Sequence, residues 1–193
     1  MPPATTTYAT CVISSWHPGA GDPTIIGWAT TGLTCFAGIL AIRCARAPAM
    51  AAVDQRFQRW FWVSTGIFLM LLALNKQLDL QTYLLAVGRC FSRLQGWYDV
   101  RREVQLLVAL VATGLVTGWV AWIMLGLRGA LSKMWLALSG LVALGLFVAL
   151  RLFEMFHVVD GGRLDAPARV FEITGPILLI LAVVLIWRPQ TQG

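Results

Sequence analysis

Five long apolar stretches, separated by short polar segments, constrain this chain more than any other feature of its sequence. They are residues 24–42, 60–74, 104–127, 134–150 and 173–187. A helix rises about 1.5 Å per residue and the hydrocarbon core of a bilayer is about 30 Å thick, so most of these stretches match membrane-spanning helices. Hydrophobic residues make up 58% of the 193 residues and charged residues only 12%, which leaves too little polar surface for a soluble domain. The sequence therefore predicts an all-α, polytopic membrane helical bundle with about five transmembrane helices.

The charges that flank the first span predict its orientation. Residues 1–23 form a polar tail without Lys or Arg, whereas four arginines follow the first span within residues 43–59. Basic segments stay on the cytoplasmic side, so the N-terminus is predicted to lie outside. No basic segment or small-residue cleavage pattern marks residues 1–23 as a signal peptide. The predicted membrane domain covers residues 24–188, and residues 189–193 form a short tail inside.

Two of the apolar stretches are shorter than a full span. The second and fifth have about 15 apolar residues, below the usual minimum of about 17. Their helices are therefore predicted to continue through polar neighbours, which include Asn75, Lys76 and Asp79 in one and Glu172 in the other. Residues 80–87 are again apolar and predict an interfacial helix across the outer face.

Small residues in the third span predict a close helix contact. Gly114 and Gly118 form a GxxxG pattern, which lets another helix approach closely. Packing within the chain is the favoured interpretation, and a contact between two copies is the alternative.

The four cysteines show no spacing that suits a zinc site. Cys11 and Cys90 are predicted on the same outer side, and a disulfide between them is left open because sequence does not report their distance.

Ionisable residues gather on the predicted outer side of the membrane. Eight of the nine acidic residues fall there, close to several basic and polar residues. A charge near hydrocarbon is costly unless it is paired, so this arrangement predicts either a binding site or a packed polar network. The candidate ligand or partner residues are Asn75, Lys76, Asp79, Asp99, Arg101, Arg102, Glu103, Arg151, Glu154, His157, Asp160 and Glu172.

Helical spacing predicts local partners within this set. Lys76 lies three residues before Asp79, and Arg151 lies three before Glu154, so each pair is expected to be in contact on one helix face. Asp99 is placed to cap the third span.

Glu154, His157 and Asp160 follow one another at intervals of three residues and are the candidate metal ligands. Glu154 and His157 form an ExxH pattern, which supplies metal ligands in di-iron bundles, but such a site needs a second ExxH and the sequence has none. A single divalent metal is therefore an alternative to simple hydrogen bonding. No cofactor is indicated otherwise, and haem is disfavoured because His17 and His157 are the only histidines.

A proline interrupts the last span. Asp165 and Pro167 predict the start of this helix. Pro176 removes the hydrogen-bond partner of the Glu172 carbonyl, which predicts either a kink filled by packing or an ion or ligand site. The packed kink is the favoured interpretation.

Three strings carry a resemblance to a known family: NKQLDLQT at residues 75–82, GWYDVRREVQ at 96–105 and RLFEMFHVVD at 151–160. They resemble a family of small, multi-span bacterial inner-membrane proteins of uncharacterised function, and the resemblance covers most of the chain. It implies a multi-pass protein of the bacterial inner (cytoplasmic) membrane and brings no activity with it. Phe156 stands beside His157 where the family pattern would have paired histidines, which weakens the metal hypothesis.

The sequence favours a binding role over a reaction. The net charge of +6 is spread over loops and helix ends, so nucleic acid is excluded as a partner. No nucleophile elbow, Walker A motif or dinucleotide fingerprint is present. The favoured interpretation is a non-catalytic subunit or accessory factor that binds membrane lipids, another membrane protein, a second copy or a small ligand at its outer face. An intramembrane metal- or acid/base-dependent enzyme acting on a lipid or lipid-linked substrate, and an ion- or proton-coupled conduit, are the alternatives.

Overall fold

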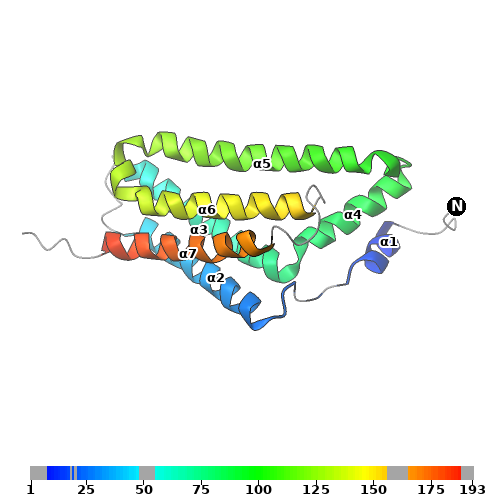
Figure 1. Cartoon of the computed structure of the whole chain (residues 1–193), viewed down its shortest axis with the longest axis horizontal. Coiled ribbons are helices and arrows are strands. Elements are labelled where there is room, and N and C mark those ends of the chain that lie inside the picture. Colours follow the sequence, from blue (N-terminus) through cyan, green and yellow to red (C-terminus); the bar gives the residue numbers. More distant parts are fainter. Residues whose placement is uncertain (1–7, 18, 20, 48–54, 156–164, 188–193) are drawn as a thin grey trace, which may run out of the picture.

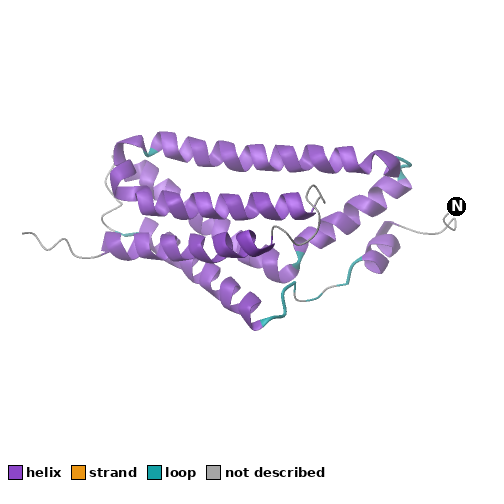
Figure 2. Ribbon diagram, viewed as in Figure 1, coloured by secondary structure: helices purple, strands orange, loops and turns teal. Residues whose placement is uncertain are grey.

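The computed structural model describes residues 8–17, 19, 21–47, 55–155 and 165–187. All five predicted spans are helices that are long and apolar enough to cross a membrane. They are α2 (Ile25–Ala45), α3 (Arg56–Leu78), α5 (Arg101–Gly126), α6 (Leu131–Met155) and α7 (Asp165–Trp187). The described residues contain no strand, as Figure 2 shows. The prediction of an all-α membrane bundle is therefore confirmed. α7 extends through Glu172 as expected, and α3 extends through Asn75 and Lys76 but ends at Leu78, before Asp79.

Two shorter helices lie at one end of the bundle (Figure 1). They are α1 (Tyr8–Ser15) and α4 (Leu80–Leu94), and short 3-10 turns η3 (Tyr98–Val100) and η4 (Arg128–Ala130) precede α5 and α6. The helix predicted over residues 80–87 is present and longer than expected, whereas α1 lies in a segment that was predicted as a tail. We call the end of the bundle that carries α1 and α4 the outer end, after the orientation predicted from the sequence.

Four of the spans form the packed core. The closest pairings are α2 with α3, α6 with α7 and α2 with α7. The largest fully buried side chains include Trp62, Leu69, Leu141 and Leu179, which come from α3, α6 and α7. α7 remains one helix through Pro176, which is buried in this core. Pro176 is therefore packed against its neighbours, whereas the kink and the alternative of an ion or ligand site stay predictions.

Glycines bring two helix pairs into backbone contact. A Cβ added at Gly66 would lie 2.9 Å from the Gly38 carbonyl oxygen, and one added at Gly140 would lie 2.9 Å from the Gly175 carbonyl oxygen. These distances are shorter than ordinary contacts, so α2–α3 and α6–α7 pack this closely only because neither helix has a side chain there.

The predicted packing at Gly114 and Gly118 is wrong. A Cβ added at either position would meet no atom within 4 Å. The physical reason is that α5 joins the core only near its C-terminal end, at Ile123: only 6% of its most apolar window is buried, against 33% in each of the other four spans. Figure 1 shows α5 running beside α6 and away from α2 and α7.

Candidate functional site

A buried carboxylate on α7 is the centre of the polar network at the outer end. Glu172 is only 7% exposed and forms an ion pair with Lys76 of α3. The Lys76 Nζ also donates a hydrogen bond of 2.6 Å to the Thr30 Oγ1 of α2 and lies 3.8 Å from the Asp22 Oδ2. A buried carboxylate needs a nearby counter-charge, so one lysine joins three spans at this point.

The predicted Lys76–Asp79 pair is not formed. α3 ends at Leu78, and Asp79 has a φ of 48°, in the left-handed region. The helical spacing that would bring Asp79 back beside Lys76 therefore does not continue to that residue. Its carboxylate instead accepts a hydrogen bond from the Thr82 hydroxyl, at the turn that joins α3 to α4. Asp is one of the few residues with a side chain that adopt this conformation readily.

The segment before α2 lies against the last turn of α3. The Gly21 N–H donates to the Gln77 carbonyl oxygen at 3.0 Å, and the Gln77 Nε2 donates to the Thr31 Oγ1 at 3.0 Å. Asp22 follows directly and accepts a 2.6 Å hydrogen bond from the Thr24 hydroxyl. This hydrogen bond is the main reason that the pKa of Asp22 lies below its usual value, with a smaller contribution from Lys76. Asp22 is therefore held as a carboxylate beside Lys76.

A second ion-pair cluster joins α6 to the start of α7. The Arg151 Nη1 donates to the Glu154 Oε2 at 2.8 Å, which confirms the predicted pair, and to the Asp165 Oδ1 at 3.0 Å. Asp165 begins α7, as the sequence predicts. Each of the two clusters consists of one basic side chain and two carboxylates.

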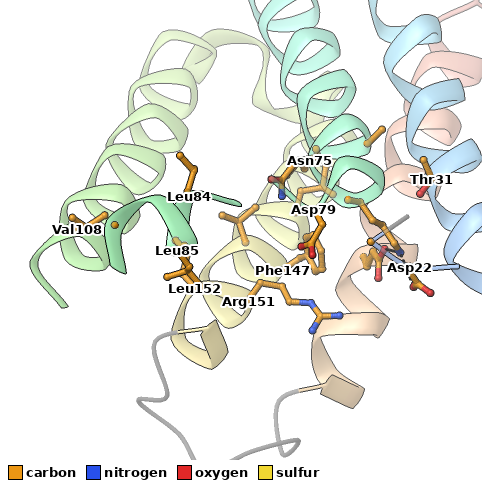
Figure 3. Close-up of a pocket in the computed structure, with 18 of the residues that line it drawn as sticks. Asp22, Thr31, Asn75, Asp79, Leu84, Leu85, Val108, Phe147, Arg151 and Leu152 are labelled. Atoms are coloured by element: carbon orange, nitrogen blue, oxygen red, sulfur yellow. Dashed lines mark hydrogen bonds and ion pairs between the residues drawn. The ribbon is translucent and has the colours of Figure 1, made fainter. Parts of the chain in front are cut away.

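A cavity of about 640 Å³ lies between these clusters and the helices α4 and α5 (Figure 3). Five of its lining residues were predicted as site residues: Asn75, Lys76, Asp79, Arg151 and Glu172. Asp22, which was not predicted, lines it as well. Its apolar wall includes Leu84, Leu85, Val108, Phe147 and Leu152. The cavity is within the size range of small-molecule sites, and it combines a charged wall with an apolar wall.

Asn75 is the unpaired polar group of this wall. Its partly buried side chain lines the cavity, as Figure 3 shows, and has no hydrogen-bond partner among the described residues. Arg89 of α4 also lines the cavity and forms no ion pair with any residue in the described part of the chain. These two side chains are available to a bound molecule.

Several predicted site residues lie elsewhere. Asp99 and Glu103 are exposed and do not line the cavity. The predicted cap at Asp99 is wrong, because a 3-10 turn precedes α5 and places Val100 at the N-cap, without a side-chain hydrogen bond. The side chains of Arg101 and Arg102 lie outside the described part of the structure.

The metal hypothesis stays a prediction. His157 and Asp160 lie outside the described residues, and Glu154 is paired with Arg151. Among the residues that the structure does describe, no group of three His, Cys, Asp or Glu side chains is arranged to hold a metal ion.

A disulfide fixes α1 to the cavity wall. Cys11 of α1 and Cys90 of α4 are bonded, with 5.9 Å between their Cα atoms, so the pairing left open by the sequence is formed. The rings of Trp16 and Tyr83 also meet edge to face, with 5.0 Å between their centroids. Because α4 contributes several cavity residues, the disulfide anchors α1 to the outer wall of the site.

The sequence did not predict the apolar half of the site. Phe147 and Leu152 belong to a stripe on α6 that also carries Arg151, and Val108 belongs to one on α5. Their helical spacing was readable, but apolar side chains of a membrane span face lipid and protein alike, so spacing alone does not identify a cavity. Comparison of the chain with known protein families, with curated proteins and with solved structures found no match.

Proposed function

We propose that this integral membrane protein is a non-catalytic binding protein that holds one membrane lipid in the cavity at its outer end. The observation that carries the proposal is the composition of that cavity, which has a charged wall and an apolar wall in one space of about 640 Å³. A lipid has the same division into a polar head and an apolar tail. A soluble metabolite would leave the apolar wall without a partner.

The charges of the cavity favour a zwitterionic headgroup. Its lining carboxylates are Asp22, Asp79 and Glu172, and its lining cations are Lys76, Arg89 and Arg151. Lys76 and Arg151 are already neutralised by carboxylates, whereas Arg89 is not. The phosphate of such a headgroup can therefore bind at Arg89. Its ammonium group is attracted to the carboxylates of Asp79 and Asp22, and Asn75 can exchange a hydrogen bond with another polar atom of the headgroup.

Two features support an orientation with the cavity on the outside. The Cys11–Cys90 disulfide lies at this end, and disulfides persist in oxidising compartments. Arg43 and Arg59 flank the opposite ends of α2 and α3, as expected for the cytoplasmic side. Together with the family resemblance, these features lead us to propose the bacterial inner membrane, with the cavity at its periplasmic face.

The proposal is tested by filling the cavity. The protein is purified in mild detergent, and its bound lipids, metals and copurifying proteins are measured by mass spectrometry in one preparation. In Val108→Trp the indole occupies the apolar wall, so we expect the retained lipid to fall several-fold. Leu110 is 65% exposed and lies about 200° round the same helix, so Leu110→Trp is the control and should retain lipid as the wild type does.

Equal lipid content in the wild type and in Val108→Trp would contradict the proposal, as would a wild-type protein without specific lipid. Loading with phosphatidylethanolamine, which is zwitterionic, should succeed better than with anionic phosphatidylglycerol. The opposite preference would contradict the assignment of the headgroup.

A further inference from the structure

The space between α5 and α6 continues beyond the outer-end cavity. A second cavity of about 210 Å³ lies along this seam, with Val116 on α5 and Val142 and Gly145 on α6 among its walls. Val148 and Leu152 line both cavities. The two spaces therefore adjoin along one face of α6.

The helices are not in tight contact at the second cavity. A Cβ added at Gly145 would have the Val116 Cγ1 as its nearest neighbour, at 4.0 Å. This contrasts with Gly140, one turn deeper on the same helix, where an added Cβ would meet the backbone of α7 at 2.9 Å. α6 thus packs closely against α7 on one face and leaves room toward α5 on the other.

The length of this seam corresponds to one leaflet of a bilayer. From Leu152 to Val142, α6 advances ten residues, or about 15 Å at 1.5 Å per residue. This is half of the hydrocarbon thickness of about 30 Å. The seam begins at Leu152, in the apolar wall of the outer-end cavity and next to Arg151, and ends near the middle of α6.

The seam is also accessible from the side. Leu107, Leu110 and Leu115 of α5 are 61%, 65% and 71% exposed, so this helix is bordered by lipid over much of its surface. A chain that enters between α5 and α6 does not have to leave the hydrocarbon region.

We propose that this seam holds one acyl chain of a phospholipid from the outer leaflet, with the chain extending from the outer-end cavity into the second cavity. The inference rests on the proposed lipid-binding function and specifies the ligand, since it requires a chain long enough to reach Val142. Binding then depends on chain length, because only a chain that reaches the second cavity makes packing contacts with its walls.

The test compares long-chain and short-chain phosphatidylethanolamine by native mass spectrometry of the purified full-length protein. We expect the wild type to bind the long-chain lipid several-fold more tightly, because only the long chain fills the second cavity and packs against its walls. In Gly145→Leu the new side chain fills the second cavity, so this preference should be lost while short-chain lipid still binds. Gly114→Leu is the matched control, because a Cβ there meets nothing within 4 Å and the residue lines neither cavity.

Equal affinity for both lipids in the wild type would overturn the proposal that the seam holds an acyl chain, but not the proposal that the outer-end cavity binds a lipid. Failure of both lipids to bind would instead overturn the proposed function itself. Val116→Phe fills the same space from α5 and repeats the test if Gly145→Leu does not yield folded protein. Retention of the chain-length preference in both variants would also overturn the inference.

Discussion

At the scale of single residues, the outer end is held together by the ion pair between Glu172 of α7 and Lys76 of α3. The side chain of Glu172 is 9% exposed and that of Lys76 is 21% exposed, so neither charge is well solvated. When one member of such a pair is removed, the other remains buried and uncompensated. The cost of that change exceeds the net contribution of the pair itself.

We therefore expect Lys76→Met to lower the free energy of unfolding by about 3–5 kcal/mol, because Glu172 loses its counter-charge. The double variant Lys76→Met/Glu172→Leu should recover most of this loss, since no charge is then buried. Thermal unfolding in detergent measures both effects. The control is Arg43→Met, which removes an exposed cation at the opposite end and should change the midpoint little. If the double variant were no more stable than Lys76→Met, the burial argument would be wrong.

The sequence predicted both Lys76 and Glu172 as site residues but not that they are partners. Helical spacing relates residues three or four apart, whereas these two are 96 positions apart in the chain. The same limitation applies to Asp79, whose left-handed conformation ends the helix on which its predicted contact depended. Local patterns identified which side chains are polar near the membrane, and only the tertiary arrangement determined how they pair.

Among the helices, close backbone contact occurs at isolated glycines and not at the GxxxG pattern. Gly38 with Gly66 and Gly140 with Gly175 are single glycines on facing helices, which no short motif identifies. The spans themselves were predicted nearly to their ends, because bilayer thickness sets how long an apolar stretch must be. Which face of each span meets another helix was not predictable, since lipid-facing and helix-facing positions are both apolar.

We expect Gly140→Ala to destabilise the protein by about 1–3 kcal/mol, the usual effect of forcing extra volume into a packed interface. The reason is that its Cβ would lie 2.9 Å from the Gly175 carbonyl oxygen and separate α6 from α7. Gly114→Ala is the control, since it gains helix propensity without a clash and should be neutral or slightly stabilising. Thermal unfolding of the two variants measures the difference, and a milder effect at Gly140 than at Gly114 would contradict the backbone contact.

At the scale of the whole molecule, the five spans are packed unequally. α2, α3, α6 and α7 form a closely packed group, while α5 contacts mainly α6 and is connected to α3 through α4. In the described part of the chain, the ion pairs and the disulfide lie at one end of this assembly. The number of spans followed from the length of the apolar stretches, and the end that carries the carboxylates followed from their placement in the sequence. The separate position of α5 did not, because its composition resembles that of the packed spans.

The proposed orientation makes a prediction for the protein in cells. A variant that retains only Cys11 should react with a membrane-impermeant maleimide added from the periplasmic side. A cysteine introduced by Arg43→Cys, in a background that lacks all four native cysteines, lies at the exposed opposite end and should react only after the membrane is permeabilised. Mass shift on gel electrophoresis reports both reactions. The reverse pattern would place the cavity in the cytoplasm.

The two glycine crossings also divide the protein into a rigid frame and an adjustable wall. Helices that touch through their backbones at Gly38–Gly66 and Gly140–Gly175 have no side chains there whose rotation could take up movement. Any widening of the proposed lipid site must then come from α4 and α5, which border it without such contacts. Exchange of one lipid for another would therefore leave the packed helices and their ion pairs in place. The helix that moves would be α5, which has the smallest buried fraction of the five spans.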